Sequence, residues 1–484
     1  MQKSKSIKKS KQYISSIIAI GFLTSLGACS TNGLIGVKDI KAPAVTIDSF
    51  RDEIPASADN SVAWWQNFSD DKLDQLVKEA QNENIGLLIA NARLKEARAQ
   101  GRATIAGFAP RVDVSSNVTT DKINKGGSLI NANTGLVDDK QSLQTSVAAA
   151  SWEIPLFGRL TNSLTGSKAN VENAKLGIEA AKIALIGDIA AAYIDLRSSQ
   201  TRLQYLEEDL ESAKTLNAVA QDRLRVGLIS QSDATFALTT LSAIEAQIPD
   251  AKLAVRAGLN RVAILRGVTP GSLDEFLAPV RNFEFKKSVP QINSIPAEFV
   301  RRRIDVRQAE QNAILMGAAV GISKADLLPS VSIRGALTLL SAVTGGPIAA
   351  DIERSSLTPA ISLTLFDFGQ KLASVKQADA RFTQALLNYK ATTMAAIAEG
   401  QQALSAYDFA RDRLIATQNG EKAALIRFNS AKKSFEVGLI AMKDRTEAER
   451  DYSQARNARL AAQAAYSDAA IAIYRTFAGS PQII

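Results

Sequence analysis

The sequence predicts a mixed membrane protein built from two internal repeats, each with two amphipathic β-strands and one very long helix. The first observation is a repeated stretch, Val-Gly-Leu-Ile, at residues 226–229 and again at 437–440, with its glycines 211 positions apart. Phe157-Gly158 and Phe368-Gly369 keep the same step. The other two observations are a proline-free helical pattern after each Phe-Gly pair and a period-two alternation of apolar and polar residues before it.

Composition excludes several classes of function. The chain has no histidine and one cysteine, which removes histidine-based acid–base catalysis, histidine metal ligation and any intrachain disulfide. No pair of carboxylates stands in a recognisable catalytic setting, so we expect no enzyme activity, no metal and no cofactor other than a covalent lipid. The net charge of +8 falls to +3 without the five lysines of residues 1–11, so we expect no nucleic-acid partner.

The N-terminal segment has the features of an export signal. A lysine-rich start leads into an apolar run over residues 13–26, which is followed by small residues and Cys29. The run is shorter than the roughly 20 residues of a membrane-spanning helix, so it predicts a cleaved signal peptide over residues 1–28. Leu-Gly-Ala-Cys resembles the bacterial lipobox, in which the cysteine is lipidated, and Ser30 after it resembles a signal for outer-membrane sorting. Cys29 is therefore the expected lipid anchor; the alternative is a buried cysteine near an ordinary cleavage site.

A first repeat is predicted over residues 71–266, after an extended tether at 29–70. Asp70 is a suitable N-cap and Pro110 a stop signal, so a helix is expected between them. A β-hairpin follows over residues 110–156, with an exposed loop between its strands. The expected apolar positions are Val112, Val114 and Val118 in the first strand and Leu143, Thr145, Val147 and Ala149 in the second.

The long helix of this repeat is expected to run from Gly158 to Arg225, because that stretch contains no proline. At about 1.5 Å per residue it would be roughly 100 Å long. A tight turn at residues 226–230 ends it, and a shorter helix then runs to about residue 266. Residues 267–296 contain four prolines and little periodicity, and are interpreted as a connector.

The second repeat, over residues 297–476, is predicted to have the same order of elements. Its hairpin is expected at 329–367, with Ala342 to Ser355 as the loop, and its turn at 437–441, before a final helix and a tail at 477–484. Its apolar strand positions are Val331, Ile333 and Leu337, then Leu357, Ile361, Leu363 and Leu365. The arginine run at 301–303 is interpreted as a solvated helix start.

Four strands of about 10 residues each have the length of membrane-spanning β-strands. Four strands cannot close a barrel, and an open sheet edge cannot lie in hydrocarbon, because each unpaired backbone group there costs several kcal/mol. The strands must therefore close with strands of other copies. Three copies would give a twelve-stranded barrel with a water-filled lumen, although two or four copies also satisfy this argument.

These features together resemble the outer membrane efflux family, the TolC- and OprM-like channels, in its lipoprotein branch. The resemblance covers essentially the whole mature chain. It is carried by the lipobox at Cys29, Trp64-Trp65, Pro110 and Pro329, Ser-Trp-Glu-Ile-Pro-Leu-Phe-Gly-Arg at 151–159 with its echo at 365–370, residues 302–310, and the two Val-Gly-Leu-Ile turns.

The resemblance implies a homotrimer with a short β-barrel in the outer membrane, a long α-helical barrel in the periplasm, and a small mixed α/β equatorial belt built from residues 267–296 and the two chain ends. It also implies the exit duct of a tripartite efflux pump for small molecules such as drugs, toxic compounds or metal ions. The partners would be a periplasmic adaptor (membrane fusion protein) and an inner-membrane transporter of the RND type.

The same resemblance points to two sites at the periplasmic tip. The adaptor-docking candidates are Arg223, Gly227, Ser230, Asp233, Gly438 and Asp444. The alternative is that the glycines only end helices and the aspartates only cap them. Ser434 and Ala441 replace Arg223 and Ser230 in the second turn, so the two turns are not expected to be equivalent. A gate is expected from Arg427, Lys432, Lys433 and Glu436, unless these form a solvated helix face.

Two alternative functions remain open from the sequence. One is the outer-membrane component of type I protein secretion. The other is a non-transporting coiled-coil envelope lipoprotein, against which the four amphipathic strands argue. The sequence names neither the substrate nor the energy source of a partner pump.

Overall fold

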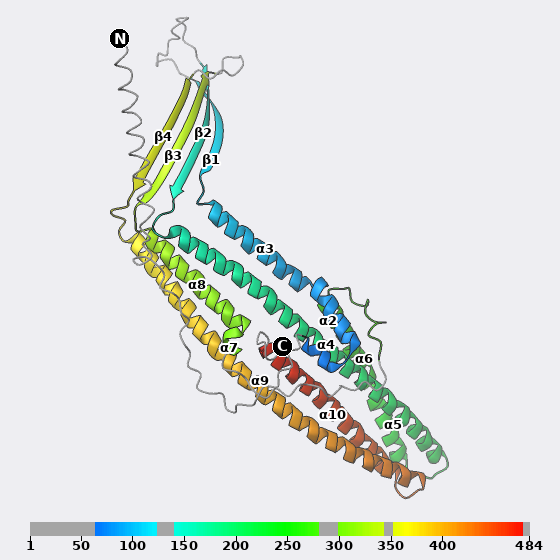
Figure 1. Ribbon diagram of the computed structural model, residues 1–484. Helices are drawn as coiled ribbons and strands as arrows, with labels where there is room; N and C mark the ends of the chain where they lie inside the picture. The colour runs from blue at the N-terminus through cyan, green and yellow to red at the C-terminus, as the bar shows by residue number, and fades with distance from the viewer. Residues whose placement is uncertain (1–62, 123–139, 280–298, 343–351, 478–484) are drawn as a thin grey trace, which may run out of the picture. The chain divides into compact units, whose positions relative to one another are not determined.

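A computed structural model describes residues 63–122, 140–279, 299–342 and 352–477 (Figure 1). The predicted signal peptide, Cys29, most of the tether and parts of both hairpin loops lie outside the described residues. The chain divides into two compact units, each of which takes segments from both repeats. The first contains the described residues of 95–172 and 310–387, and the second contains the described residues of 44–94, 173–309 and 388–484. The sequence repeats are therefore not the compact units.

The elements follow the predicted order of helix, two strands, long helix, turn and helix in both halves. The first half contains η3 (Trp64–Phe68), α2 (Asp71–Glu83), α3 (Ile85–Ala106), β1 (Arg111–Lys122), β2 (Lys140–Ile154), α4 (Arg159–Arg225), α5 (Gln231–Glu245) and α6 (Gln247–Arg266). The second contains α7 (Phe299–Arg302), α8 (Ile304–Ala325), β3 (Ser330–Ala342), β4 (Ile352–Ser362), α9 (Gln370–Glu436) and α10 (Met442–Phe477). The long helices α4 and α9 each have 67 residues.

Three helices expected to be continuous are divided, into α2 and α3, α5 and α6, and α7 and α8, and the first two divisions have an identifiable reason. At Asn84 the backbone leaves the helical region with ψ 126. The side chain of Asn84 accepts a hydrogen bond from the Leu87 N–H at 3.1 Å and donates one to the Leu265 carbonyl at 2.7 Å, so it caps α3 and ties it to α6. The second division is between α5 and α6, where Pro249 has no N–H to donate to the carbonyl of Glu245.

The four strands form one antiparallel sheet in the order β1-β2-β3-β4 (Figure 1). Within one chain, β1 and β4 are its edges, and neither edge pairs with another described strand. No described helix is both long and apolar enough to cross a bilayer. The strand β4 begins at Ile352, inside the predicted loop, and ends at Ser362, so Leu363 and Leu365 lie beyond the strand. The serine-rich start of β4 has no apolar alternation, so its pattern could not mark a strand.

The register separates an apolar face from a polar face, because directly opposed residues of neighbouring strands lie on the same face. One row runs Val112, Ala150, Gly335 and Leu357, and the next runs Val114, Ala148, Leu337 and Ser355, whereas the third row, Ser116, Ser146, Leu339 and Glu353, is mainly polar. The opposite face is polar. Its residues with described side chains include, by strand, Arg111, Asp113, Ser115, Asn117 and Thr119; Thr145, Val147, Ala149, Ser151 and Glu153; Ser332, Arg334, Ala336 and Thr338; and Arg354, Ser356, Thr358 and Ala360.

The predicted apolar set of the second strand was therefore wrong. Val147 lies opposite Ser115 and Thr145 opposite Asn117, both on the polar face. The apolar face of β2 consists instead of Ala148, Ala150, Trp152 and Ile154, because these residues oppose Leu337, Gly335, Ile333 and Val331 of β3. The apolar positions predicted within β1 and β3 agree with the register, as do Leu357 and Ile361 in β4.

The core of the second unit brings both chain ends together with the connector. Trp64 is buried and stacks on Tyr474 of α10 at 4.6 Å between ring centroids. Leu273 and Leu277 of the connector join the same apolar cluster as Trp64. Residues 64–70 are therefore packed rather than part of an extended tether, and Phe477, predicted to begin the tail, is the buried last residue of α10. Among the described residues this region contains no strand, and residues 280–298 of the predicted belt lie outside the described residues.

One arginine of the predicted solvated run is buried. Arg303 is 9% exposed and forms ion pairs with Asp305 at 2.8 Å and with Glu399 of α9 at 2.5 Å. It also donates a hydrogen bond to the carbonyl of Thr476 at 3.2 Å. The interpretation as a solvated helix start is therefore wrong for Arg303, which links the start of α8 to α9 and to the end of α10.

Candidate functional site: the helical tips and the polar sheet face

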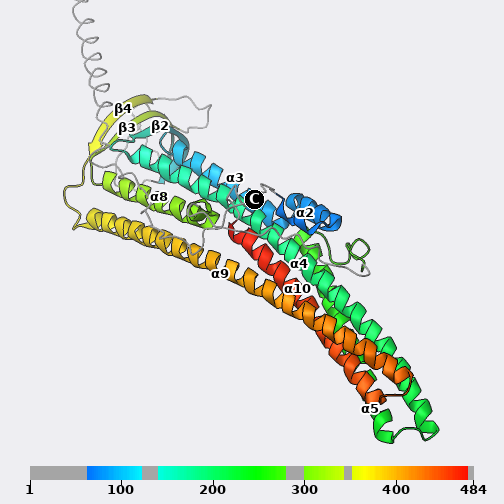
Figure 2. The same ribbon diagram turned by 60° about the horizontal axis from the view of Figure 1, so that its bottom comes forward.

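Two tight turns join α4 to α5 and α9 to α10 (Figure 2). Their backbone geometry is the same. Gly227 has φ +75 and Gly438 has φ +77. The Leu228 N–H donates to the Arg223 carbonyl at 2.8 Å, and the Leu439 N–H donates to the Ser434 carbonyl at 2.8 Å. This is the helix end that favours glycine, since only glycine adopts the left-handed conformation without strain.

The helix starts after the two turns differ in their capping. Ser230 and Asp233 form a complete capping box, in which the Asp233 N–H donates to Ser230 Oγ at 3.1 Å and the Ser230 N–H donates to the Asp233 carboxylate at 3.4 Å. In the second turn only the reverse half exists, from the Ala441 N–H to Asp444 at 3.3 Å. The reason is that Ala441 has no hydroxyl to accept the other hydrogen bond.

The tips expose apolar side chains that the sequence prediction did not name. Val226 is 68% exposed and Leu228 73%, while Val437 is 70% and Leu439 77%. Ending a helix in water does not require exposed aliphatic side chains, and exposed apolar patches on a surface commonly mark interaction sites. The repeated Val-Gly-Leu motif itself was the signal, because it placed aliphatic residues on either side of a solvent-exposed turn.

Phe435 joins the two turns within one chain. The guanidinium of Arg223 lies 5.1 Å from the centre of its ring, and that of Arg445 lies 5.5 Å from it. These cation–π contacts connect the end of α4 with the end of α9 and the start of α10. Arg223, a predicted docking residue of the first turn, is thus linked to the second turn through Phe435 and Arg445. The sequence analysis missed these two residues because they are more than 200 positions away from Arg223.

The predicted gate residues all lie in the last three turns of α9. Arg427 forms an ion pair with Asp451 of α10. Lys432, Lys433 and Glu436 are exposed and make no ion pair with another described residue. A lysine ring would need several copies of the chain, so the gate stays a prediction.

A buried arginine holds α10 to α4 behind the tips. Arg456 has only 7% of its side chain exposed and pairs with Glu208 at 2.9 Å and Asp209 at 2.5 Å. Its guanidinium also lies 4.3 Å from the ring centre of Tyr205. Because a buried charge is stable only when it is paired and hydrogen-bonded, this cluster fixes α10 against α4.

One carboxyl in the second unit is poised to titrate. Burial, and then the neighbouring Asp195, raise the pKa of Asp468 to about 6, while Arg261 acts in the opposite direction. Stability from the neutral form is therefore present at acidic pH and is lost as the pH rises through about 6. Among the described residues, no three His, Cys, Asp or Glu side chains are placed so that they could hold a metal ion.

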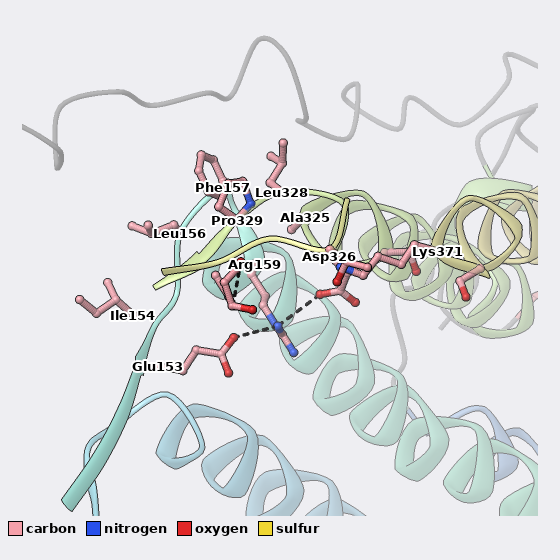
Figure 3. A pocket seen from close by; sticks show the side chains of 15 residues that line it. Glu153, Ile154, Leu156, Phe157, Arg159, Ala325, Asp326, Leu328, Pro329 and Lys371 are labelled. Carbon is pink, nitrogen blue, oxygen red and sulfur yellow. Dashed lines mark hydrogen bonds and ion pairs between the residues drawn. The ribbon is translucent and has the colours of Figure 1, made fainter. Parts of the chain in front are cut away.

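A polar pocket of about 380 Å³ lies at the foot of the sheet in the first unit (Figure 3). Arg159, at the start of α4, reaches Glu153 of β2 and Asp326 after α8, each at 3.2 Å. Lys371, from the first turn of α9, also lines the pocket. Glu153 belongs to the polar face of the sheet, so that face ends in a pocket with two cationic side chains.

A family model described as outer membrane efflux protein matches residues 76–268 and 296–479. The chain is similar to nodulation protein T of Rhizobium leguminosarum bv. viciae, with 27% identity over 83% of this chain and 80% of that protein. It is also similar to the pyoverdine export outer membrane protein OpmQ of Pseudomonas putida, with 25% identity over 87% of this chain and 88% of that protein.

Solved structures show the same fold. The CmeC outer membrane channel of Campylobacter jejuni aligns with a TM-score of 0.77 and 23% identity, over 90% of each chain.

Proposed function

The chain belongs to the outer membrane efflux protein family, and from this premise we propose that three copies assemble into the exit duct of a tripartite pump. The protein is an outer-membrane efflux channel and not an enzyme. In the proposed assembly a periplasmic adaptor and an inner-membrane transporter of the RND type deliver small molecules to it, and the transporter supplies the work. The helices of the second unit form the periplasmic barrel, with the equatorial belt around it.

The observation that carries a barrel shared between copies is the four-stranded sheet with two faces and two free edges. Its strands have 12, 15, 13 and 11 residues, enough to span a bilayer. Its apolar face suits lipid and its polar face suits water. Pairing β1 of one copy with β4 of the next closes both edges, which an isolated chain cannot do.

The test is single-channel recording of the purified protein in a planar lipid bilayer. A closed barrel of several copies predicts discrete conductance steps, from a channel that is closed most of the time. Protein that inserts no channel at any applied voltage would contradict the duct and favour a non-transporting envelope lipoprotein.

Replacing Lys432 and Lys433 by glutamine tests the proposed gate in the same recordings. Loss of their mutual repulsion should lower the open probability, and an unchanged open probability would reject these residues as the gate.

We propose the tips as the adaptor-docking surface. Their support is the pair of matching glycine turns, the asymmetric capping and the exposed Val226, Leu228, Val437 and Leu439. Burying aliphatic side chains against a partner stabilises the complex by about 1.5–3 kcal/mol for each. Replacing Val226 and Leu228 by serine should therefore weaken binding of the purified adaptor more than tenfold.

The matched control is the same pair of changes in the second turn, at Val437 and Leu439. Because the two turns differ in capping, we expect unequal losses. If both variants keep the wild-type affinity for the adaptor while the oligomer stays intact, the tips do not dock the adaptor.

A lipid on Cys29 is the proposed anchor of the mature chain. Its support is the lipobox-like sequence at the end of the export signal, in which Cys29 is the one cysteine of the chain. Intact-mass measurement of protein extracted from membranes should show acyl chains and cleavage before Cys29. Cys29→Ser should lose both, and an unmodified wild-type cysteine would refute the anchor.

A further inference from the structure

The middle of the polar face of the sheet, from the level of Arg334 to the level of Arg354, has an excess of positive charge. The charged side chains described on this face are Arg111, Asp113, Glu153, Arg334 and Arg354, and the register places Asp121 on the same face at the far end of β1. Arg111 is neutralised by Asp113, at 2.8 Å, and Glu153 is neutralised by Arg159, at 3.2 Å. The remaining two, Arg334 and Arg354, are exposed and form no ion pair within the described part of the chain.

The register places these two arginines at different heights on adjacent strands. Arg334 of β3 lies opposite Thr358, whereas Arg354 of β4 lies opposite Thr338. Four residues along a strand separate the two levels by about 13 Å. Lys371, in the pocket at the foot of the same face, adds a third cationic side chain without an ion pair to a described residue.

We propose that the lumen lined by this face selects anions, so that negatively charged solutes are the substrate class that crosses the sheet region most readily. The inference rests on the proposed function, since it needs the polar face turned toward water in a closed barrel. Three copies would set three Arg334 side chains at one level and three Arg354 side chains at the next. Arginine rings in a pore with a low-dielectric wall attract anions and repel cations, as the rings of anion pores do.

The experiment measures the reversal potential of single channels under a tenfold gradient of KCl. Wild-type channels should favour chloride over potassium. Replacing Arg334 and Arg354 together by glutamine should lower the chloride-to-potassium permeability ratio about threefold or more, and each single change should have a smaller effect. The difference should shrink in about 1 M salt, where the screening length falls to about 3 Å. The reversal potential does not depend on how often the channel opens, so a mostly closed tip does not prevent the measurement.

The matched control replaces the same two arginines by lysine, which keeps the charge and changes the shape. This variant should retain the wild-type permeability ratio, which separates a charge effect from a disturbed barrel. Channels that conduct in all variants with one unchanged ratio would overturn the inference and leave the pore in place. A complete lack of channels in the wild type would instead reject the proposed function on which the inference rests.

Discussion

Gly267→Ala is expected to destabilise the second unit severely. Gly267 has φ +93, and a Cβ at this position would lie 2.4 Å from the carbonyl oxygen of Glu83 and 3.0 Å from its carbonyl carbon. Both are backbone atoms at the end of α2, so they cannot move aside as the end of a side chain can. Left-handed strain of about 1–2 kcal/mol and overpacking of about 1–3 kcal/mol together predict a loss on the order of 3 kcal/mol.

The measurement is the thermal unfolding of the purified protein in detergent, followed by the helical circular dichroism signal. Gly271→Ala is the matched control, because Gly271 has a similar φ of +95 but open space around it. That variant should lose only the strain contribution of about 1–2 kcal/mol. Equal losses in the two variants would contradict the close approach of Gly267 to α2.

Arg197→Met is expected to release the connector from α4. Arg197 is 1% exposed and donates hydrogen bonds to Gln200 at 2.8 Å, to the carbonyl of Ala278 at 3.1 Å and to the Tyr193 hydroxyl at 3.1 Å. The Tyr193 hydroxyl in turn donates to Asp70, the N-cap of α2, at 2.6 Å. Methionine fills much of the space but leaves these acceptors unsatisfied, for a loss of about 3 kcal/mol or more.

Two measurements check this expectation. The unfolding temperature should fall, and cleavage after Glu275 by a glutamate-specific protease should become faster, because the connector no longer has its anchor. Arg202→Met is the control, since Arg202 is an exposed residue of the same helix. A stable Arg197→Met variant whose connector resists the protease would show that apolar packing of Leu273 and Leu277 is sufficient by itself.

The sequence predicted the features that depend on local chemistry. A proline-free stretch closed by glycine gave each 67-residue helix to within a residue or so. Asp70 marked the N-cap of α2, and Pro110 and Pro329 marked the strand starts, because each of these signals acts on residues within one turn of the chain.

The features it did not predict depend on partners far away in the chain. The two faces of β2 could not be distinguished, because Val147 and Ala149 are as apolar as Ala148 and Ala150, and only the pairing with β1 and β3 decides between them. Arg303 looks solvated in the sequence, since its acceptor Glu399 is 96 positions away. Phe435 was missed for the same reason, because its guanidinium partner Arg223 belongs to the other repeat.

The most direct test of the shared barrel is the mass of the folded protein in a mild detergent, measured by native mass spectrometry. Three copies of the mature chain in one stable particle, resistant to dissociation until the sheet melts on heating, is the predicted result. A folded monomer that keeps its four-stranded sheet in the membrane would contradict the account, because its two free edges would then be stable in lipid without any partner.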